Sequence, residues 1–180
     1  MRNTKLKDVV QNKYKNLTKY QKWMLLEAMF ATYPKAFICV TASHRIIPVN
    51  NICIHDYTSG DIQIEYTLSP PPPNFSMRYY ENLNYAGADR VDLYINNDYI
   101  LDITDVRRVL VSVLGRWRNI DIDYITDDMS VTGFIKTANN ISLLYRLFDI
   151  DRGIIKITHK TTIGDFVKKV TEYRKNKETL

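Results

Sequence analysis

The stretch from Arg90 to Trp117 constrains the fold more than any other part of the sequence. Within residues 91–95 apolar and polar side chains alternate as in a half-buried strand, and residues 99–103 resume this alternation after a short Asn-Asn-Asp turn. From Val106 onward, apolar residues recur at helical spacing and form one continuous stripe that has to be buried. The stretch therefore predicts a strand, a turn, a second strand and an amphipathic helix, which together form an α+β core.

Hydrophobic periodicity predicts further elements on both sides of this core. We expect helices over residues 17–33 and 163–175, and Pro34 ends the first of them because the residue before a proline avoids helical geometry. We expect strands at residues 36–41, 51–55, 61–68, 120–124, 131–137, 141–150 and 153–158. The predicted fold class is α+β, a single domain with a mostly antiparallel sheet packed against two or three amphipathic helices.

Length and composition are those of an ordinary folded protein. A chain of 180 residues with 45% hydrophobic residues is long enough to bury a core of its own. The apolar runs are too short to cross a bilayer, and the basic N-terminus lacks the apolar segment of a secretory signal. We expect the two cysteines, Cys39 and Cys53, to be buried thiols in a reducing compartment of a protein that is not secreted.

The net charge of +5 is unevenly distributed along the sequence. Residues 1–22 carry seven basic side chains and one acidic side chain, residues 168–180 carry five and two, and the body between them is mildly acidic. Positive ends are typical of attachment to nucleic acid or to an anionic membrane surface, and basic termini that only increase solubility explain them equally well. The candidate contact residues are Arg2, Lys5, Lys7, Lys13, Lys15, Lys19 and Lys22.

The polar, lysine-rich residues 1–16 are expected to form a basic mobile arm. Residues 17–180 are expected to form the single α+β domain, interrupted by a proline-rich loop at 69–88. In the helix expected at 17–33, lysines precede Trp23, which is how an interfacial membrane helix begins. Packing of this amphipathic helix on the sheet is the favoured interpretation.

A run of prolines carries the most specific short signal. Pro70, Pro71, Pro72 and Pro73 cannot continue a sheet and favour the polyproline II conformation. Together with Phe75 they differ by one hydroxyl group from the P-P-x-Y ligands that aromatic grooves of WW domains bind. Because that hydroxyl group is missing, a stiff spacer is the favoured interpretation, and a host WW-type domain is the expected partner if the loop binds one.

No catalytic signature appears in the sequence. Asp121, Asp123, Asp127 and Asp128 could hold a hard cation, but a solvated face and turn is the favoured interpretation because the spacing of a calcium loop is missing. The three histidines and two cysteines lack zinc-ligand spacing. There is no glycine-rich phosphate loop, serine-hydrolase elbow or metalloprotease motif. We expect no enzymatic activity, no cofactor and no metal.

The order of these elements resembles that of the rhabdovirus matrix proteins, and the length is closest to the plant-infecting, cytorhabdovirus-like members. The resemblance covers residues 69–118 and is one of pattern rather than of specific motifs. The sequence departs from the family at Phe75, where a tyrosine is expected, and in the helix and strands that precede the prolines. The matching parts are Pro70 to Pro73, the strands Val91–Ile95 and Tyr99–Ile103, and the helix Val106–Trp117.

The resemblance implies a viral structural protein that self-associates and bridges the ribonucleoprotein to an anionic membrane. The N-terminal lysines would contact lipid or nucleocapsid, and the proline loop would contact neighbouring copies or host factors. Such a protein is found in the virion and in the host cytoplasm or at the inner membrane surface. The resemblance implies no catalytic residue.

Two alternatives stay open. An RNA-binding viral accessory protein, such as a silencing suppressor, would use basic residues for phosphates and tyrosines for stacked bases. A metal-dependent enzyme would use the Asp121–Asp128 group. In each case the same core is expected, formed by Val40, Ile54, Ile64, Leu93, Val109, Val113, Trp117, Leu144, Ile155 and Phe166.

The substitution Val113→Asp tests the predicted apolar stripe. An unpaired charge in a buried stripe costs several kcal/mol, roughly the whole stability of a domain, so we expect this variant to lose soluble expression. The yield of soluble protein and its melting temperature are the measurements. A normal yield with unchanged melting would show that the stripe is not buried.

Overall fold

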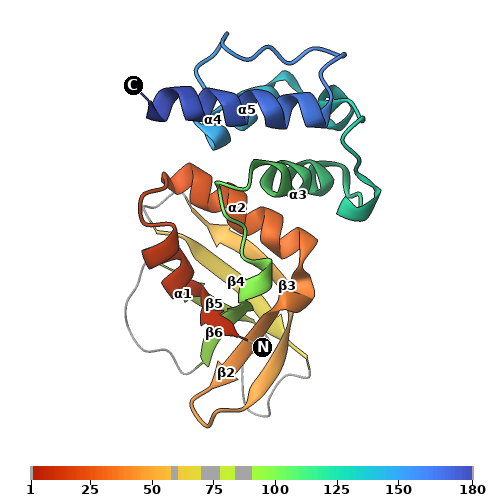
Figure 1. Cartoon of the computed structure of the whole chain (residues 1–180). Helices are drawn as coiled ribbons and strands as arrows, with labels where there is room; N and C mark the ends of the chain where they lie inside the picture. Colours follow the sequence, from red (N-terminus) through yellow and green to blue (C-terminus); the bar gives the residue numbers. More distant parts are fainter. Residues whose placement is uncertain (1, 58–60, 70–77, 84–90, 180) are drawn as a thin grey trace. The chain divides into compact units, whose positions relative to one another are not determined.

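The computed structural model of the protein describes residues 2–57, 61–69, 78–83 and 91–179 (Figure 1). It confirms the α+β class, because the described residues form helices and one antiparallel six-stranded sheet in the order β1-β6-β2-β3-β4-β5. The chain divides into two compact units, Met1–Ile100 and Leu101–Leu180. This division falls inside the region 17–180 that was predicted as a single domain, and each unit is described by itself below.

The first unit holds the whole sheet. Its strands are β1 (Asn3–Lys5), β2 (Phe37–Thr41), β3 (Ile46–Asp56), β4 (Gln63–Leu68), β5 (Tyr79–Asn82) and β6 (Val91–Asn96). Its helical segments are α1 (Leu6–Asp8), η1 (Val9–Lys13), α2 (Lys19–Thr32), η2 (Pro34–Ala36) and η3 (Asn97–Tyr99). The helix predicted over 17–33 and the three strands predicted between residues 36 and 68 are confirmed. Strand β3 is longer than predicted and includes Pro48, which lies opposite Ile38 of β2.

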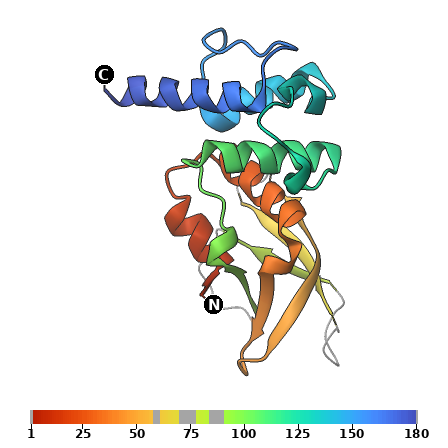
Figure 2. The same cartoon turned by 45° about the vertical axis from the view of Figure 1, so that its right-hand side comes forward.

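Helix α2 lies on one face of the sheet (Figure 2). The Thr18 hydroxyl accepts a hydrogen bond from the main-chain N–H of Gln21, whose side chain accepts one from the Thr18 N–H, so a capping box starts the helix. The side chains of its apolar face are fully buried, and the ring of Phe30 packs edge-on at 5.1 Å from that of Phe37 in β2. Packing on the sheet is therefore confirmed as the interpretation of this helix.

Alternation along the strands separates the two faces of the sheet. In β4, Ile64 and Tyr66 are buried whereas Glu65 between them is half-exposed. Cys39 of β2 belongs to the buried face, and burial raises the pKa of its thiol to about 11. Cys53 pairs with Glu65 and is exposed, so the prediction of two buried thiols is right for Cys39 and wrong for Cys53.

The N-terminal segment is part of the fold. Strand β1 pairs with β6, with Thr4 opposite Ile95, and the side chains that follow it turn into the core. The prediction of a mobile arm over residues 1–16 is therefore wrong for the described residues 2–16. The physical reason is an apolar set at helical spacing among the lysines, formed by Leu6, Val9, Val10 and Tyr14, all of them buried.

The same segment reaches the opposite edge of the sheet. The Nζ atom of Lys7 lies 3.8 Å from Oε1 of Glu81 in β5, and the Gln11 side chain donates to the main-chain carbonyl of Leu83 at 3.0 Å. Strands β1 and β5 are the two edge strands of the sheet. Because the segment that follows β1 contacts residues at β5, the sheet must be curved enough to bring its two edges within reach of α1 and η1. The exposed fractions of Lys7 and Glu81 are only 6% and 4%, so the ion pair is buried.

The second unit is helical in its described residues. Its elements are α3 (Val106–Arg118), η4 (Ile122–Tyr124), η5 (Val131–Phe134), α4 (Ala138–Phe148) and α5 (Ile163–Glu178). The helices predicted over 106–117 and 163–175 are confirmed. The strands predicted at 99–103, 120–124, 131–137, 141–150 and 153–158 are wrong, because none of these ranges pairs in the sheet.

Helix α4 shows why a strand prediction failed. Its apolar run fits a buried strand, but Leu144, Leu147 and Phe148 also lie at helical spacing, and all three are buried. Thr137 and Asn140 form a capping box at its start, and Asp149 ends it in the left-handed conformation at φ 54°. Local capping thus favours the helix where the periodicity is ambiguous.

The core of the second unit is built on α5. The ring of Phe166 packs edge-on against Phe148 at 5.8 Å, and the Arg174 guanidinium lies over the Phe148 ring, 5.5 Å from its centre. Arg174 also donates a hydrogen bond of 2.7 Å to the main-chain carbonyl of Ile103. Burial lowers the pKa of this guanidinium.

The predicted core residues are mostly buried. The exceptions are Val40, Ile54 and Trp117, which are half-buried. The buried ones are Ile64, Leu93, Val109, Val113, Leu144, Ile155 and Phe166.

The Lys7–Glu81 ion pair generates a stability prediction. The substitution Glu81→Leu removes the carboxylate that offsets the buried Lys7 charge, so we expect a loss of about 3–5 kcal/mol in the free energy of unfolding. The double variant Lys7→Met/Glu81→Leu removes both charges and should recover most of this loss. Urea denaturation at constant temperature measures these free energies.

The control for this cycle is Lys5→Met, which breaks a partly exposed pair with Asp92. Exposed pairs contribute about 1 kcal/mol or less, so this variant should remain near wild type. A Glu81→Leu variant as stable as the control would contradict the assigned role of the buried pair.

Candidate nucleic-acid interface

The structure separates the seven predicted contact residues into two groups. Lys5 lies 3.5 Å from Asp92, whose charge raises the pKa of the Lys5 ammonium group. Lys7 is buried against Glu81, so its prediction as a surface contact is wrong. Arg2 is exposed beside β1, where its main-chain carbonyl accepts a hydrogen bond from Asn97.

The other four lysines lie around the start of α2. Lys13 ends η1 and Lys15 follows it, and both are exposed. Lys19 and Lys22 occupy the first helical turns and are half-exposed. No acidic residue occurs in the sequence between Asp8 and Glu27. This part of the chain therefore carries a local excess of positive charge.

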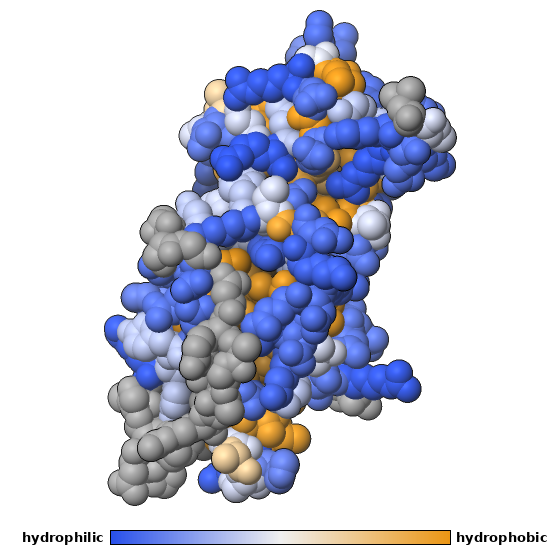
Figure 3. Space-filling view, turned by 90° about the vertical axis from the view of Figure 1, so that its left-hand side faces the viewer, coloured by the Kyte–Doolittle hydropathy of each residue, from blue (hydrophilic) through white to orange (hydrophobic). Residues whose placement is uncertain are grey.

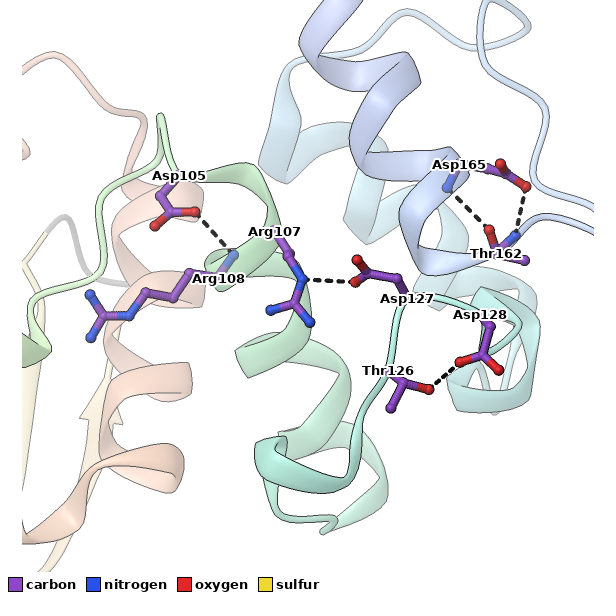
Figure 4. Close-up of polar contacts among 8 residues, drawn as sticks. All are labelled: Asp105, Arg107, Arg108, Thr126, Asp127, Asp128, Thr162 and Asp165. Atoms are coloured by element: carbon purple, nitrogen blue, oxygen red, sulfur yellow. Dashed lines mark hydrogen bonds and ion pairs between the residues drawn. The ribbon is translucent and has the colours of Figure 1, made fainter.

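Lys19 and Lys22 lie near the N-terminus of α2, where the helix dipole is positive and a cation is unfavourable. The first turn of α2 contains no acidic residue, whereas Asp105 is the N-cap residue of α3 and α5 has Asp165 in its first turn (Figure 4). Hydrogen bonds from Thr162 lower the pKa of the Asp165 carboxyl group, as expected for a stabilising cap. A cation near a helix N-terminus is unfavourable by about 0.3–1 kcal/mol, so α2 gives up stability and gains a stronger positive potential.

Aromatic rings lie beside the lysines. Trp23 of α2 stacks on Tyr57 with ring centroids 4.6 Å apart and planes within 4° of parallel. Tyr20 meets Trp23 edge-on at 5.4 Å, and the Lys19 ammonium lies 5.9 Å from the centre of the Tyr57 ring. All three residues are half-buried, so none of them is enclosed in the core.

We call this set the basic–aromatic site. It consists of Lys13, Lys15, Lys19, Lys22, Tyr20, Trp23 and Tyr57. Sequence reasoning identified the lysines and Trp23 but missed Tyr57, which β3 delivers from far along the chain. No spacing in the sequence signals that contact. Chemically, rings supply flat faces for stacking, and ammonium groups next to them supply charges for phosphates.

The predicted proline motif lies outside the described residues. This holds for Pro70, Pro71, Pro72, Pro73 and Phe75, so their role as a partner-binding loop or a stiff spacer stays a prediction. The loop predicted over 69–88 is wrong in one part, because residues 79–82 form β5.

The acidic group of the second unit does not converge on one point. The Arg107 Nε donates to Asp127 at 2.8 Å, and Thr126 donates to Asp128 (Figure 4). Asp121 accepts a hydrogen bond from the main-chain N–H of Asp123. Within residues 2–57, 61–69, 78–83 and 91–179, no three His, Cys, Asp or Glu side chains are arranged to hold a metal ion.

The visible surface is mainly hydrophilic on the face shown in Figure 3, with narrower hydrophobic patches between the polar side chains. Among the helices that the structure describes, none is both long and apolar enough to cross a membrane.

Comparisons with known proteins give no match to a family model, a curated protein or a solved structure. The resemblance to rhabdovirus matrix proteins therefore stays a prediction. One feature on which it depended, the strand at 99–103, is not present.

Proposed function

We propose that the protein binds single-stranded RNA through the basic–aromatic site. The observation that carries this proposal is the stacked pair of Trp23 and Tyr57, with the Lys19 ammonium over the Tyr57 ring. A strand that runs past this site can stack a base on a partly open ring while its phosphates meet the lysines. Paired bases do not offer their faces in this way, so the site favours unpaired strands.

The arrangement of α2 favours RNA over a lipid surface. An interfacial membrane helix needs an apolar face that can enter the headgroup region. In α2 the large apolar side chains Leu25, Leu26 and Met29 are fully buried inside the protein. The less buried side chains at the start of α2 are Lys19, Tyr20, Lys22 and Trp23, which suit a flexible polyanion that carries stacking groups.

The folded N-terminal segment weakens the case for the matrix-like role that the resemblance implied. That role depended on a mobile basic arm, and residues 3–13 instead form β1, α1 and η1. Lys7 faces the core, so it is not part of a mobile basic surface. We therefore place RNA binding, the alternative in the sequence analysis, ahead of a self-associating membrane bridge.

The proposal predicts how affinity responds to salt. Each lysine that contacts a phosphate contributes about 0.7 to the slope of log affinity against log salt on a single strand. The variant Lys15→Gln/Lys22→Gln should reduce that slope by about 1.4. Fluorescence anisotropy of a labelled 12-residue oligouridylate across a salt series is the measurement.

A matched control comes from α5. Lys168 and Lys169 are exposed, and Lys168→Gln/Lys169→Gln removes the same charge without touching the site. This control should keep the wild-type slope. The variant Tyr57→Leu should weaken binding at all salt concentrations with the slope unchanged, because stacking releases no counterions. Equal slopes in both lysine variants would contradict the proposal, as would flotation with phosphatidylserine vesicles in the absence of oligonucleotide binding.

A further inference from the structure

A cavity of about 510 Å³ lies at the C-terminal end of α2. Helix α2 ends at Thr32, and Pro34 begins η2, so the chain turns sharply there. The end of β6 and the turn η3 close the other side. The volume falls within the range of pockets that bind small molecules, about 300–1,000 Å³. The lining residues all belong to the first unit and include Thr32, Tyr33, Lys35, Ala36, Asn96 and Tyr99.

Two tyrosine rings form the apolar wall of the cavity. Tyr33 follows α2 and Tyr99 ends η3, and their ring centroids are 4.9 Å apart at an angle of 45°. The Tyr99 side chain is 39% exposed although it is large and apolar. A partly open aromatic face inside a concave site is a surface on which a planar ring can stack.

Polar groups flank this wall. Asn96 is 92% buried, its side-chain oxygen accepts a hydrogen bond from the Asp98 N–H, and this fixes the amide at the cavity. Lys35 is exposed and lines the cavity, so its side chain supplies a positive charge there. A lysine ammonium is a point charge suited to phosphate.

We infer that this cavity binds a nucleoside phosphate, with the base stacked on Tyr99 and the phosphate at Lys35. The open ring of Tyr99 and the ammonium group of Lys35 match the base and the phosphate of such a ligand. The cavity is at the opposite end of α2 from the basic–aromatic site, and a helix of 14 residues is about 20 Å long. The inference is therefore independent of the proposed function. The ligand is either a free mononucleotide or the phosphorylated end of a strand.

Equilibrium dialysis with AMP tests the inference, with adenosine and inorganic phosphate as separate probes. The variant Tyr99→Leu should weaken AMP and adenosine by about tenfold or more, because a stacked base is lost. The variant Lys35→Gln should weaken AMP and leave adenosine unchanged. The matched controls are Tyr124→Leu and Lys160→Gln, whose side chains are exposed in the second unit. Melting curves establish that each variant folds.

The two ligand sources are separated by a further arm with oligouridylates that carry either a phosphate or a hydroxyl group at the 5′ end. If Tyr99→Leu and Lys35→Gln weaken AMP, the free nucleotide is a ligand. If they weaken only the 5′-phosphorylated oligonucleotide, the strand end is the ligand. The inference is overturned if neither ligand responds to these variants, or if phosphate alone binds as well as AMP. The Lys15→Gln/Lys22→Gln variant should keep wild-type AMP affinity. A failure of the AMP test therefore leaves the RNA-binding proposal standing, and a failure of the RNA test leaves this inference standing.

Discussion

The buried ion pair between Lys7 and Glu81 joins the start of the chain to the far edge of the sheet. Two charges inside a protein are tolerated only when they lie together, so burial of Lys7 requires the Glu81 carboxylate beside it. Pairing of β1 with β6 holds the other end of the same segment. The curvature of the sheet follows, because its two edge strands are bridged by a few residues. The same segment also buries Leu6, Val9, Val10 and Tyr14 in the core of the first unit.

The closure also determines where positive charge appears on the surface. With α1 and η1 fixed, Lys13 and Lys15 lead into a capped helix, and their position relative to Trp23 is set by the fold. Strand β3 then brings Tyr57 onto Trp23. Charges and rings that are already in place lose less conformational freedom on binding than those of a mobile arm. This preorganisation is the physical difference between the structure and the arm that the lysine content predicted.

Strong periodicity made parts of the fold predictable, but it did not suffice everywhere, because the alternation at 99–103 belongs to no strand. The stripe at 106–117 and the alternation at 61–68 each fit one period only, and both predictions are confirmed. The apolar pattern at 141–150 fits a strand and a helix equally well, and the capping residues at its two ends stabilise the helix. At the candidate site, lysines near α2 were visible in the sequence. The Tyr57 stacking contact and the Lys7–Glu81 pair were not, because both join residues far apart in the chain.

The most direct test of RNA binding at the basic–aromatic site measures the acetylation rate of every lysine by mass spectrometry, with and without an oligouridylate. The site predicts that bound RNA slows acetylation of Lys15, Lys19 and Lys22. Lys168 and Lys169 on α5 should react at unchanged rates and serve as internal references. Slowing that is equal at all exposed lysines, or confined to α5, would contradict the assignment of RNA binding to the start of α2.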